Sequence, residues 1–70
     1  MADSIYRVTE VIGTSSESWE DATRHAVETA AQTVRDLRVG EVVKPDVTIE
    51  DGRVTQYRSR VNISFKYERD

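Results

Sequence analysis

The stretch Thr14–Arg38 reads TSSESWEDATRHAVETAAQTVRDLR and has the periodicity of one long amphipathic helix. Apolar residues, mostly small, recur in it every three or four positions, and the positions between them are mainly charged. The apolar stripe comprises Trp19, Ala22, Ala26, Val27, Ala30, Thr33, Val34 and Leu37. Small side chains between a helix and a sheet allow the two backbones to approach each other closely. We therefore expect a helix that lies close to a sheet on one face and meets water on the other.

Two features mark the ends of this expected helix. Hydroxyl residues stand at its beginning, where a side-chain oxygen can accept from an unpaired N–H of the first turn. Thr14 precedes Glu17 with capping-box spacing, but Ser15 or Ser16 could serve as the cap equally well. Basic residues near Arg38 suit the negative end of the helix dipole. The sequence therefore predicts where the helix starts and leaves the capping residue open.

The segment before the helix, Ile5–Ile12, has the composition of a β-strand. It is rich in β-branched residues and alternates with a period of two. One side carries Tyr6, Val8 and Ile12. The other side, which we expect to face outward, carries Ile5 and Val11 and is only half polar. An outer face with apolar residues indicates contact beyond the monomer.

The segment after the helix has the pattern of two strands joined by a tight turn. The first of them runs from Val39 to Ile49, with Pro45 inside it. Proline cannot donate a ladder hydrogen bond, so we expect this strand at a sheet edge or with a bulge at that point. Asp51-Gly52 supplies the positive φ angles that a tight hairpin needs. The last strand follows over Val54–Tyr67.

The last strand has the cleanest alternation in the chain. Its outward row contains Arg58, Arg60 and Lys66, so a slip by one residue would bury positive charge. The order of elements predicts an α+β fold of β-α-β-β type, a three-stranded antiparallel sheet wrapped on one long helix, with the strands ordered first, third, second. One helix covers only one face, so the basic row is solvated, paired with another subunit, or used to hold a ligand. The expected inward row comprises Tyr57, Ser59, Val61, Ile63, Phe65 and Tyr67.

Length and composition limit the classes of function. Seventy residues make one domain, residues 1–70, and 37% hydrophobic against 33% charged residues leave little for a core. The chain has no cysteine and a single histidine, His25, which excludes disulfides, thiolate metal sites and a histidine cluster, and we expect no enzymatic activity. The net charge of −3 gives no reason to expect nucleic-acid binding. Self-association remains as a way to stabilise so short a chain.

The first twelve residues contain no apolar block of the length that a signal peptide or membrane span needs, so we expect a cytoplasmic protein. Two single residues also have an expected environment. Trp19 is expected in the core at the start of the helix. His25 lies among charged helix positions and is expected on the solvated surface.

Taken in order, these segments resemble the dodecin family. The first strand runs into Gly13-Thr14-Ser15 and the long helix, and the strand opening Glu41-Val42, the hairpin Asp51-Gly52 and the closing Val61–Lys66 follow. The resemblance spans roughly residues 6–67. Dodecins are hollow, spherical homododecamers, and most store flavins in pockets between subunits. The resemblance thus implies the self-association that the composition favours.

Four positions bear on which ligand the resemblance implies. In flavin-binding dodecins a tryptophan of the second strand stacks on the flavin ring, and the matching Val39 has no π face. A glutamine that hydrogen-bonds the ring is matched by Arg58, which has donors but no acceptor. An arginine that meets a coenzyme A phosphate in some relatives is matched by Asp46, whereas Lys66 keeps the charge of a second such position. Val39, Arg58 and Lys66 are therefore the candidate ligand-binding residues, and flavin is the less expected ligand.

The calcium dodecins are a closer resemblance. It is carried by Gly13-Thr14-Ser15 followed by Ser18-Trp19-Glu20, by Leu37-Arg38-Val39 and by Ser64-Phe65-Lys66. Calcium takes about six to eight oxygen ligands, usually several carboxylates among them. The candidate metal ligands are Asp46, Glu50 and Asp51, and the alternative is that they are solvated residues of the hairpin.

The resemblance therefore implies a dodecameric shell that binds or stores a small ligand or ion at subunit contacts, with calcium as the candidate. Two alternatives stay open. One is a flavin-storing dodecin with an altered pocket, and the other is a purely structural assembly without a small ligand.

Overall fold

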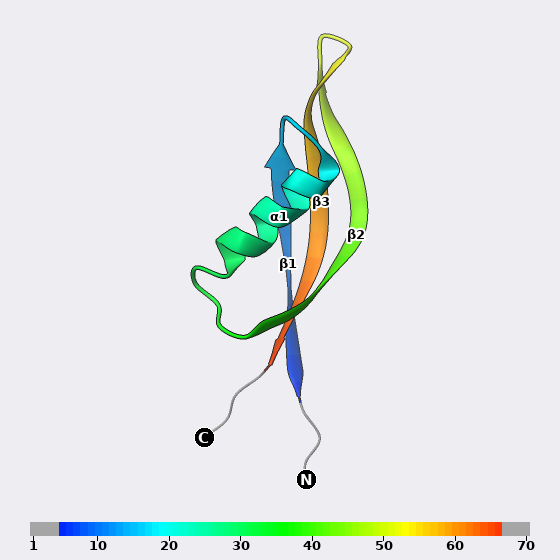
Figure 1. Cartoon of the computed structure of the whole chain (residues 1–70). Helices are drawn as coiled ribbons and strands as arrows, with labels where there is room; N and C mark the ends of the chain where they lie inside the picture. Colours follow the sequence, from blue (N-terminus) through cyan, green and yellow to red (C-terminus); the bar gives the residue numbers. More distant parts are fainter. Residues whose placement is uncertain (1–4, 67–70) are drawn as a thin grey trace.

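The computed structural model describes residues 5–66 as three long strands and one helix. Strand β1 spans Tyr6–Ser15, helix α1 spans Trp19–Ala30, and strands β2 and β3 span Leu37–Glu50 and Arg53–Lys66 (Figure 1). The sheet is antiparallel and ordered β1-β3-β2, with the helix on one face. The α+β fold and the strand order are therefore confirmed. Tyr67, expected in the inward row, lies outside the described residues.

The β2–β3 hairpin forms where the sequence predicts it. Asp51 and Gly52 have φ angles of 52° and 74°, the left-handed region that a two-residue hairpin turn requires. Pro45 lies in an edge strand, and the register of β2 against β3 shifts between Val42 and Lys44, just before the proline. The expected edge position of Pro45 is confirmed, whereas the bulge lies before the proline, which itself pairs in register with Ser59.

The helix is shorter than its sequence pattern predicts. It begins at Trp19 rather than Thr14, because β1 continues through Ser15 in register with β3. The capping residue is Ser18, whose side chain accepts from the N–H of Asp21. The Ser15 hydroxyl instead accepts from the backbone N–H groups of Glu17 and Ser18, across the turn between strand and helix. None of the three expected capping residues is the cap.

The helix also ends earlier than expected. Its last residue is Ala30, turns follow over residues 31–35, and Leu37 already belongs to β2. Asp36 adopts a φ of 60°, and its carbonyl accepts from the Lys66 N–H at 3.3 Å, so the backbone is drawn into the sheet there. The apolar spacing of Thr33, Val34 and Leu37 is real, but these residues lie in the connection and in β2.

The core between helix and sheet is thin. Among the described residues its buried hydrophobic members are Ala22, Ala26, Val61 and Ile63. The small residues of α1 lie on Gly13 of β1, where an added Cβ would come within 2.1 Å of the Ala22 carbonyl oxygen. A hydroxyl pair, Thr23 Oγ1 and the fully buried Ser59 Oγ at 2.7 Å, joins the helix to the central strand. The expected close approach of helix and sheet is thus confirmed.

Strand β1 presents the opposite face from the one predicted. Val11 pairs with the buried Val61 and packs against the core, whereas Tyr6, Val8 and Ile12 are exposed. Both sides of β1 carry apolar residues, so alternation alone did not determine which side the helix covers. The glycine does, because only the face of Gly13 can accept the helix backbone. The uncovered face therefore carries Ile12 and its neighbours instead of Val11.

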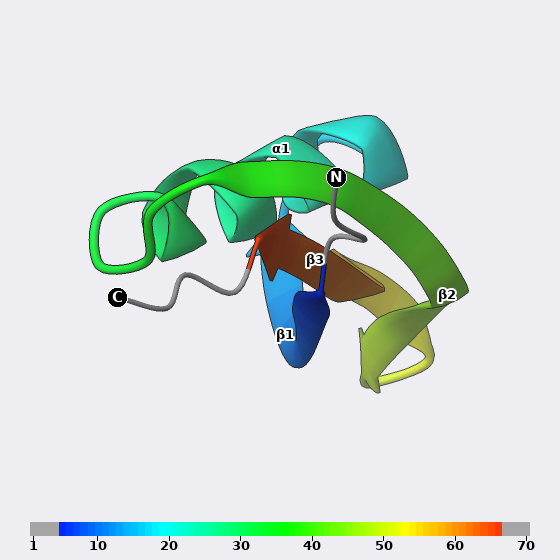
Figure 2. The ribbon, with the colours of Figure 1, turned by 90° about the horizontal axis from the view of Figure 1, so that it is seen from below.

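The molecule is elongated, and much of its apolar surface has no cover. The principal extents are 55 × 20 × 14 Å, and the radius of gyration is 14.5 Å, against about 11 Å for a compact domain of this length. The helix lies over β1 and β3 and barely touches β2, which curves past it (Figure 2). The large hydrophobic residues with more than two fifths of their surface exposed are Ile5, Tyr6, Val8, Ile12, Trp19, Val39, Val42, Val43, Ile49 and Val54. In the part of the chain described, no helix is long and apolar enough to cross a membrane.

Candidate functional site on the uncovered sheet face

An ion pair between neighbouring strands is the most structured feature of the uncovered face. Asp46 of β2 and Arg58 of β3 are register partners, so their side chains leave the sheet side by side. Arg58 Nε donates to Asp46 Oδ1 at 2.7 Å, and Nη2 donates to Oδ2 at 3.0 Å. Two parallel bonds of this kind fix the orientation of both groups. The side chains are 35% and 39% exposed, so water reaches the pair.

The backbone of Asp46 is held from the other side of the sheet by the helix. The Trp19 indole N–H donates to the Asp46 carbonyl oxygen at 3.0 Å, and its ring meets that of Tyr57 edge-on, with centroids 5.1 Å apart. Trp19 is 43% exposed, so its expected place in the core is wrong for the single chain. The reason is its position at the start of the helix, beside the edge strand, where the sheet has no further cover.

The pKa values of the two partners move in the directions that a paired state requires. The pKa of Asp46 lies below its ordinary value of 3.8, chiefly because Arg58 donates to its carboxylate. Partial desolvation opposes this shift, and the charges of Arg58, Arg60 and Lys44 add smaller contributions that lower the pKa. The hydrogen bond to Asp46 likewise raises the pKa of Arg58. Arg60 and Lys44 therefore belong to the same electrostatic neighbourhood, in which three cations surround one carboxylate.

This shift predicts a pH dependence of stability. Since the folded-state pKa of Asp46 is depressed, its contribution is present above its unfolded pKa and is lost as the pH falls through the folded value, below 3.8. We expect Asp46→Asn to have a lower thermal midpoint than the wild type at pH 7, and we expect the difference between the two midpoints to shrink as the pH falls below 3.8. Midpoints of both proteins across this range test it. In an Arg58→Gln background, Asp46→Asn should change the thermal midpoint much less at every pH. If it lowers the midpoint as much as in the wild type, the pairing of Asp46 with Arg58 is contradicted.

Two further rows of side chains cross the same face. In the first, Ile12 of β1, Arg60 of β3 and Lys44 of β2 lie in register. In the second, Glu10, Asn62 and Glu41 are aligned in the same order, two residues further along β3. A row with two cations therefore lies beside a row with two carboxylates. The sequence pattern identified Arg60 but neither Lys44 nor the glutamates, because their alignment depends on the strand register.

The three candidate ligand-binding residues share this face but not one place on it. Arg58 and Lys66 are eight residues apart on β3, and Val39 lies opposite Ser64, near the Lys66 end. Six residues of strand, or about 20 Å, separate Ser64 from Arg58. Val39 and Lys66 are exposed, whereas Arg58 is occupied by Asp46. Within one chain, Val39 and Lys66 therefore adjoin one end of the sheet and Arg58 lies nearer the other.

The three candidate metal ligands are also spread out. Asp46 faces Arg58, Glu50 ends β2, and Asp51 is the first residue of the turn, four and five residues further on. Within residues 5–66, no three side chains among histidine, aspartate and glutamate gather so closely that one chain could hold a metal ion by itself.

A side-chain cluster that the sequence did not indicate lies at the start of the helix. Asp21 accepts from the Ser15 hydroxyl at 2.7 Å, pairs with Arg24, and has His25 Nε2 at 3.5 Å. The hydrogen bond from Ser15 is the main reason that the pKa of Asp21 is lowered, with His25 and Arg24 acting in the same direction. His25 is exposed as expected, but its Nδ1 also lies 3.1 Å from the Thr14 carbonyl oxygen. The cluster joins β1 to α1.

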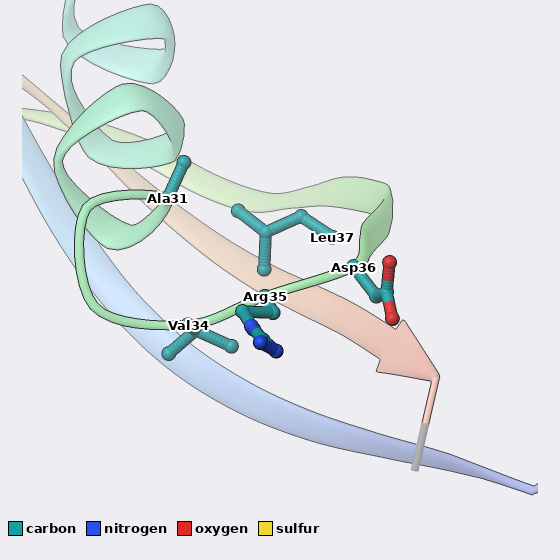
Figure 3. Close-up of a pocket in the computed structure, with 5 residues that line it drawn as sticks. All are labelled: Ala31, Val34, Arg35, Asp36 and Leu37. Atoms are coloured by element: carbon teal, nitrogen blue, oxygen red, sulfur yellow. The ribbon is translucent and has the colours of Figure 1, made fainter. Parts of the chain in front are cut away.

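The hollows of the single chain lie away from the ion pair. One, of about 530 Å³, lies at the connection between α1 and β2 and is lined by Ala31, Val34, Arg35, Asp36 and Leu37 (Figure 3). Another, of about 610 Å³, runs between the β1 edge and the helix and includes Ile12 and His25. Both are wide open to solvent, so neither has the form of a closed ligand pocket.

Comparison with known proteins places these features in a family context. The dodecin family model matches residues 5–68. The calcium dodecin of Mycobacterium tuberculosis is 40% identical over 63 residues, which cover 90% of this chain and 89% of the relative. A dodecin structure from Streptomyces coelicolor superimposes with a TM-score of 0.91 at 40% identity over the full length of both chains. The crystal structure of the M. tuberculosis calcium dodecin, a calcium-chelating antigen with a calcium-binding site, gives a TM-score of 0.81 at 38% identity and covers 91% of each chain.

Proposed function

Because this chain belongs to the dodecin family, we propose that it forms a homododecameric hollow shell that binds or stores a small ligand, with calcium rather than flavin as the ligand. The assembly is supported by an imbalance within residues 5–66, where four hydrophobic side chains are buried in the core while many large ones on β1 and β2 are exposed. So little burial leaves a single chain marginal, and copies that cover one another's β2 and outer sheet face would supply the missing contact.

The side chains on the uncovered face support a ligand other than flavin. Val39, at the position of the stacking residue, offers no aromatic face. Arg58 Nε and Nη2 each donate to Asp46, so a flavin edge could use only the remaining donors of the guanidinium unless this pair breaks. The 40% identical calcium dodecin supports calcium as the ligand. We place the shell in the cytoplasm and give it a binding role rather than a catalytic one.

Calcium in this proposal lies at a contact between subunits, where carboxylates of several chains can meet. Asp46, Glu50 and Asp51 are the proposed ligands. Asp46 would bind the ion in competition with Arg58, since both of its oxygens accept from the guanidinium in the free chain. Glu50 and Asp51 are exposed at the tip of the hairpin, which extends beyond the helix (Figure 1). The hairpin tip can therefore reach a neighbouring subunit.

Metal analysis after extensive dialysis against calcium-free buffer tests the ligand. We expect Asp46→Ala and Asp51→Ala each to weaken calcium retention by about tenfold or more, since even outer-shell partners of metal ligands matter by about 10–100-fold. Arg58→Gln should strengthen retention, because it frees the Asp46 carboxylate. Glu28→Ala removes a carboxylate from the exposed side of α1 and serves as the control.

Three outcomes would contradict the proposal, each in a different part. If the aspartate variants retain all bound calcium, the assigned ligands are wrong. A yellow protein with a flavin absorption spectrum would favour the flavin-storing alternative, and a shell without metal or flavin would favour a purely structural assembly. A dilute sample that sediments as a persistent monomer of 8.0 kDa would overturn the shell itself.

A further inference from the structure

The charged residues of the uncovered face form two rows of opposite sign. Lys44 and Arg60 are register partners, and a like-charged pair directly opposite in a sheet is unfavourable unless anionic groups approach it. Glu10 and Glu41 flank Asn62 in the next row, two strand spacings or about 10 Å apart, and add two negative charges with no cation between them. We call the first the basic row and the second the acidic row. Contact with an acidic row would stabilise the basic row, and contact with a basic row would stabilise the acidic row.

The two rows do not satisfy each other within one chain. They lie two residues apart along β3, or about 7 Å. Among the described residues, neither Lys44 nor Arg60 makes an ion pair with Glu10 or Glu41 or with any other carboxylate. Arg58, by contrast, is paired with Asp46 and lies outside the basic row. The charges of Lys44 and Arg60 act on Asp46, but Arg58 already engages that carboxylate in two hydrogen bonds. The basic row therefore keeps an excess of positive charge, beside two carboxylates, on a face that the helix does not cover.

This arrangement is self-complementary under one particular rotation. A twofold axis in the contact plane, perpendicular to the strands and midway between the two rows, brings the acidic row of one copy over the basic row of the other. Glu41 of one chain then lies over Lys44 of the second copy, and the Asn62 amide lies over Arg60. Glu10 lies over Ile12 and is diagonal to Arg60. By symmetry each of these contacts forms twice.

We propose that the uncovered face docks on a second copy of this chain, turned end for end, so that basic and acidic rows of the two copies pair. The proposal rests on the assembly proposed above and identifies which surface and which side chains select the neighbouring subunit. Complementary charge of this kind sets orientation and excludes the parallel arrangement, in which like rows would face each other.

Exchanging the charges of one row at a time tests the pairing. The double variant Lys44→Glu with Arg60→Glu makes both rows acidic, and Glu10→Lys with Glu41→Lys makes both rows basic. We expect either variant alone to lose self-association through this face, by about a hundredfold or more at low salt, because like charges are juxtaposed. An equimolar mixture should recover the assembled species, since an acidic face then meets a basic one. Sedimentation velocity of each sample measures this, with Glu28→Lys, Arg35→Glu as a control that exchanges charges away from the face.

Recovery on mixing also shows that each variant is folded, and the circular dichroism spectrum of each checks this separately. If a double variant does not fold, the milder Lys44→Gln, Arg60→Gln variant replaces it, and its assembly should respond to added salt much less than that of the wild type.

The proposal is overturned if the charge-exchanged variants assemble like the wild type, or if folded variants dissociate and the mixture restores nothing. Inorganic phosphate binding to the wild type without recovery on mixing would assign the basic row to a free anion instead. A wild-type shell with unaffected variants would overturn this pairing alone, whereas a wild-type monomer would overturn the shell as well.

Discussion

Gly13→Ala is expected to destabilise this protein more than any other single methyl group added to it. The new Cβ would lie 2.1 Å from the Ala22 carbonyl oxygen, 2.9 Å from Ala26 Cβ and 3.0 Å from Ala26 N. Two of these atoms belong to the helix backbone and cannot rotate away, so α1 must move off β1. Overpacking costs about 1–3 kcal/mol and occasionally more, and we expect the upper end here. For seventy residues, the free energy of unfolding itself is about 4–10 kcal/mol.

Gly40→Ala is the matched control, since it adds the same methyl group to another strand. There the nearest atoms are Val61 Cγ1 at 3.5 Å and Val27 Cγ2 at 3.7 Å, which is ordinary contact distance. The control should change the free energy of unfolding by less than about 1 kcal/mol, in the stabilising direction if at all. Urea unfolding, followed by far-UV circular dichroism at one fixed protein concentration, compares the two, because association also contributes to stability. Equal effects of the two substitutions would show that the helix does not rest on Gly13.

Ile63→Ala is expected to have the second large effect. Ile63 is 1% exposed, and it is the largest of the fully buried side chains in the described part of the chain. Truncating a buried isoleucine to alanine removes about 2–5 kcal/mol, depending on how far the surroundings collapse. In so thin a core, few neighbours can fill the cavity, so the loss should lie in the middle of this range or above it. The same urea unfolding experiment measures it.

Ile49→Ala removes the same atoms from an exposed position and provides the comparison. Ile49 is 65% exposed in β2, so its truncation should cost less than about 1 kcal/mol in the free chain. If Ile63→Ala were no more damaging than Ile49→Ala, the core would have to lie elsewhere. A large effect of Ile49→Ala confined to the assembled protein would show that a neighbouring subunit covers β2.

The fold was predictable from sequence because one strand is unambiguous. The alternation in β3 fixes which residues point inward, and the buried Ser59, Val61 and Ile63 confirm it. The Asp51-Gly52 turn fixes the neighbour of β3, and the order of elements leaves one antiparallel arrangement. The extent of the helix was not predictable in the same way, since its apolar spacing continues past Ala30 into residues that the sheet recruits. Pairing of Leu37 with Phe65 outweighs helix propensity there.

The ion pair could not be derived from the hairpin. Starting from Glu50 opposite Arg53, an unbroken register would place Asp46 opposite Tyr57, on the helix side. The register shift between Thr48 and Ile49 moves Asp46 by one residue, to a position opposite Arg58 on the uncovered side. A second shift between Val42 and Lys44 moves the register back. Such irregularities depend on packing across the whole sheet, so the sequence could identify both residues as candidates but not as partners.

The helix-to-edge contact of Trp19 makes this chain a natural spectroscopic reporter. It is the sole tryptophan, its indole N–H is bonded to the Asp46 carbonyl, and its ring touches Tyr57. Fluorescence excited at wavelengths that tryptophan absorbs and tyrosine does not therefore reports on one place, the contact between the start of α1 and strand β2. This contact lies at the backbone of Asp46, whose carboxylate Arg58 binds. Emission wavelength and quenching by iodide can follow any event that shifts the edge strand, without a dye or an engineered label.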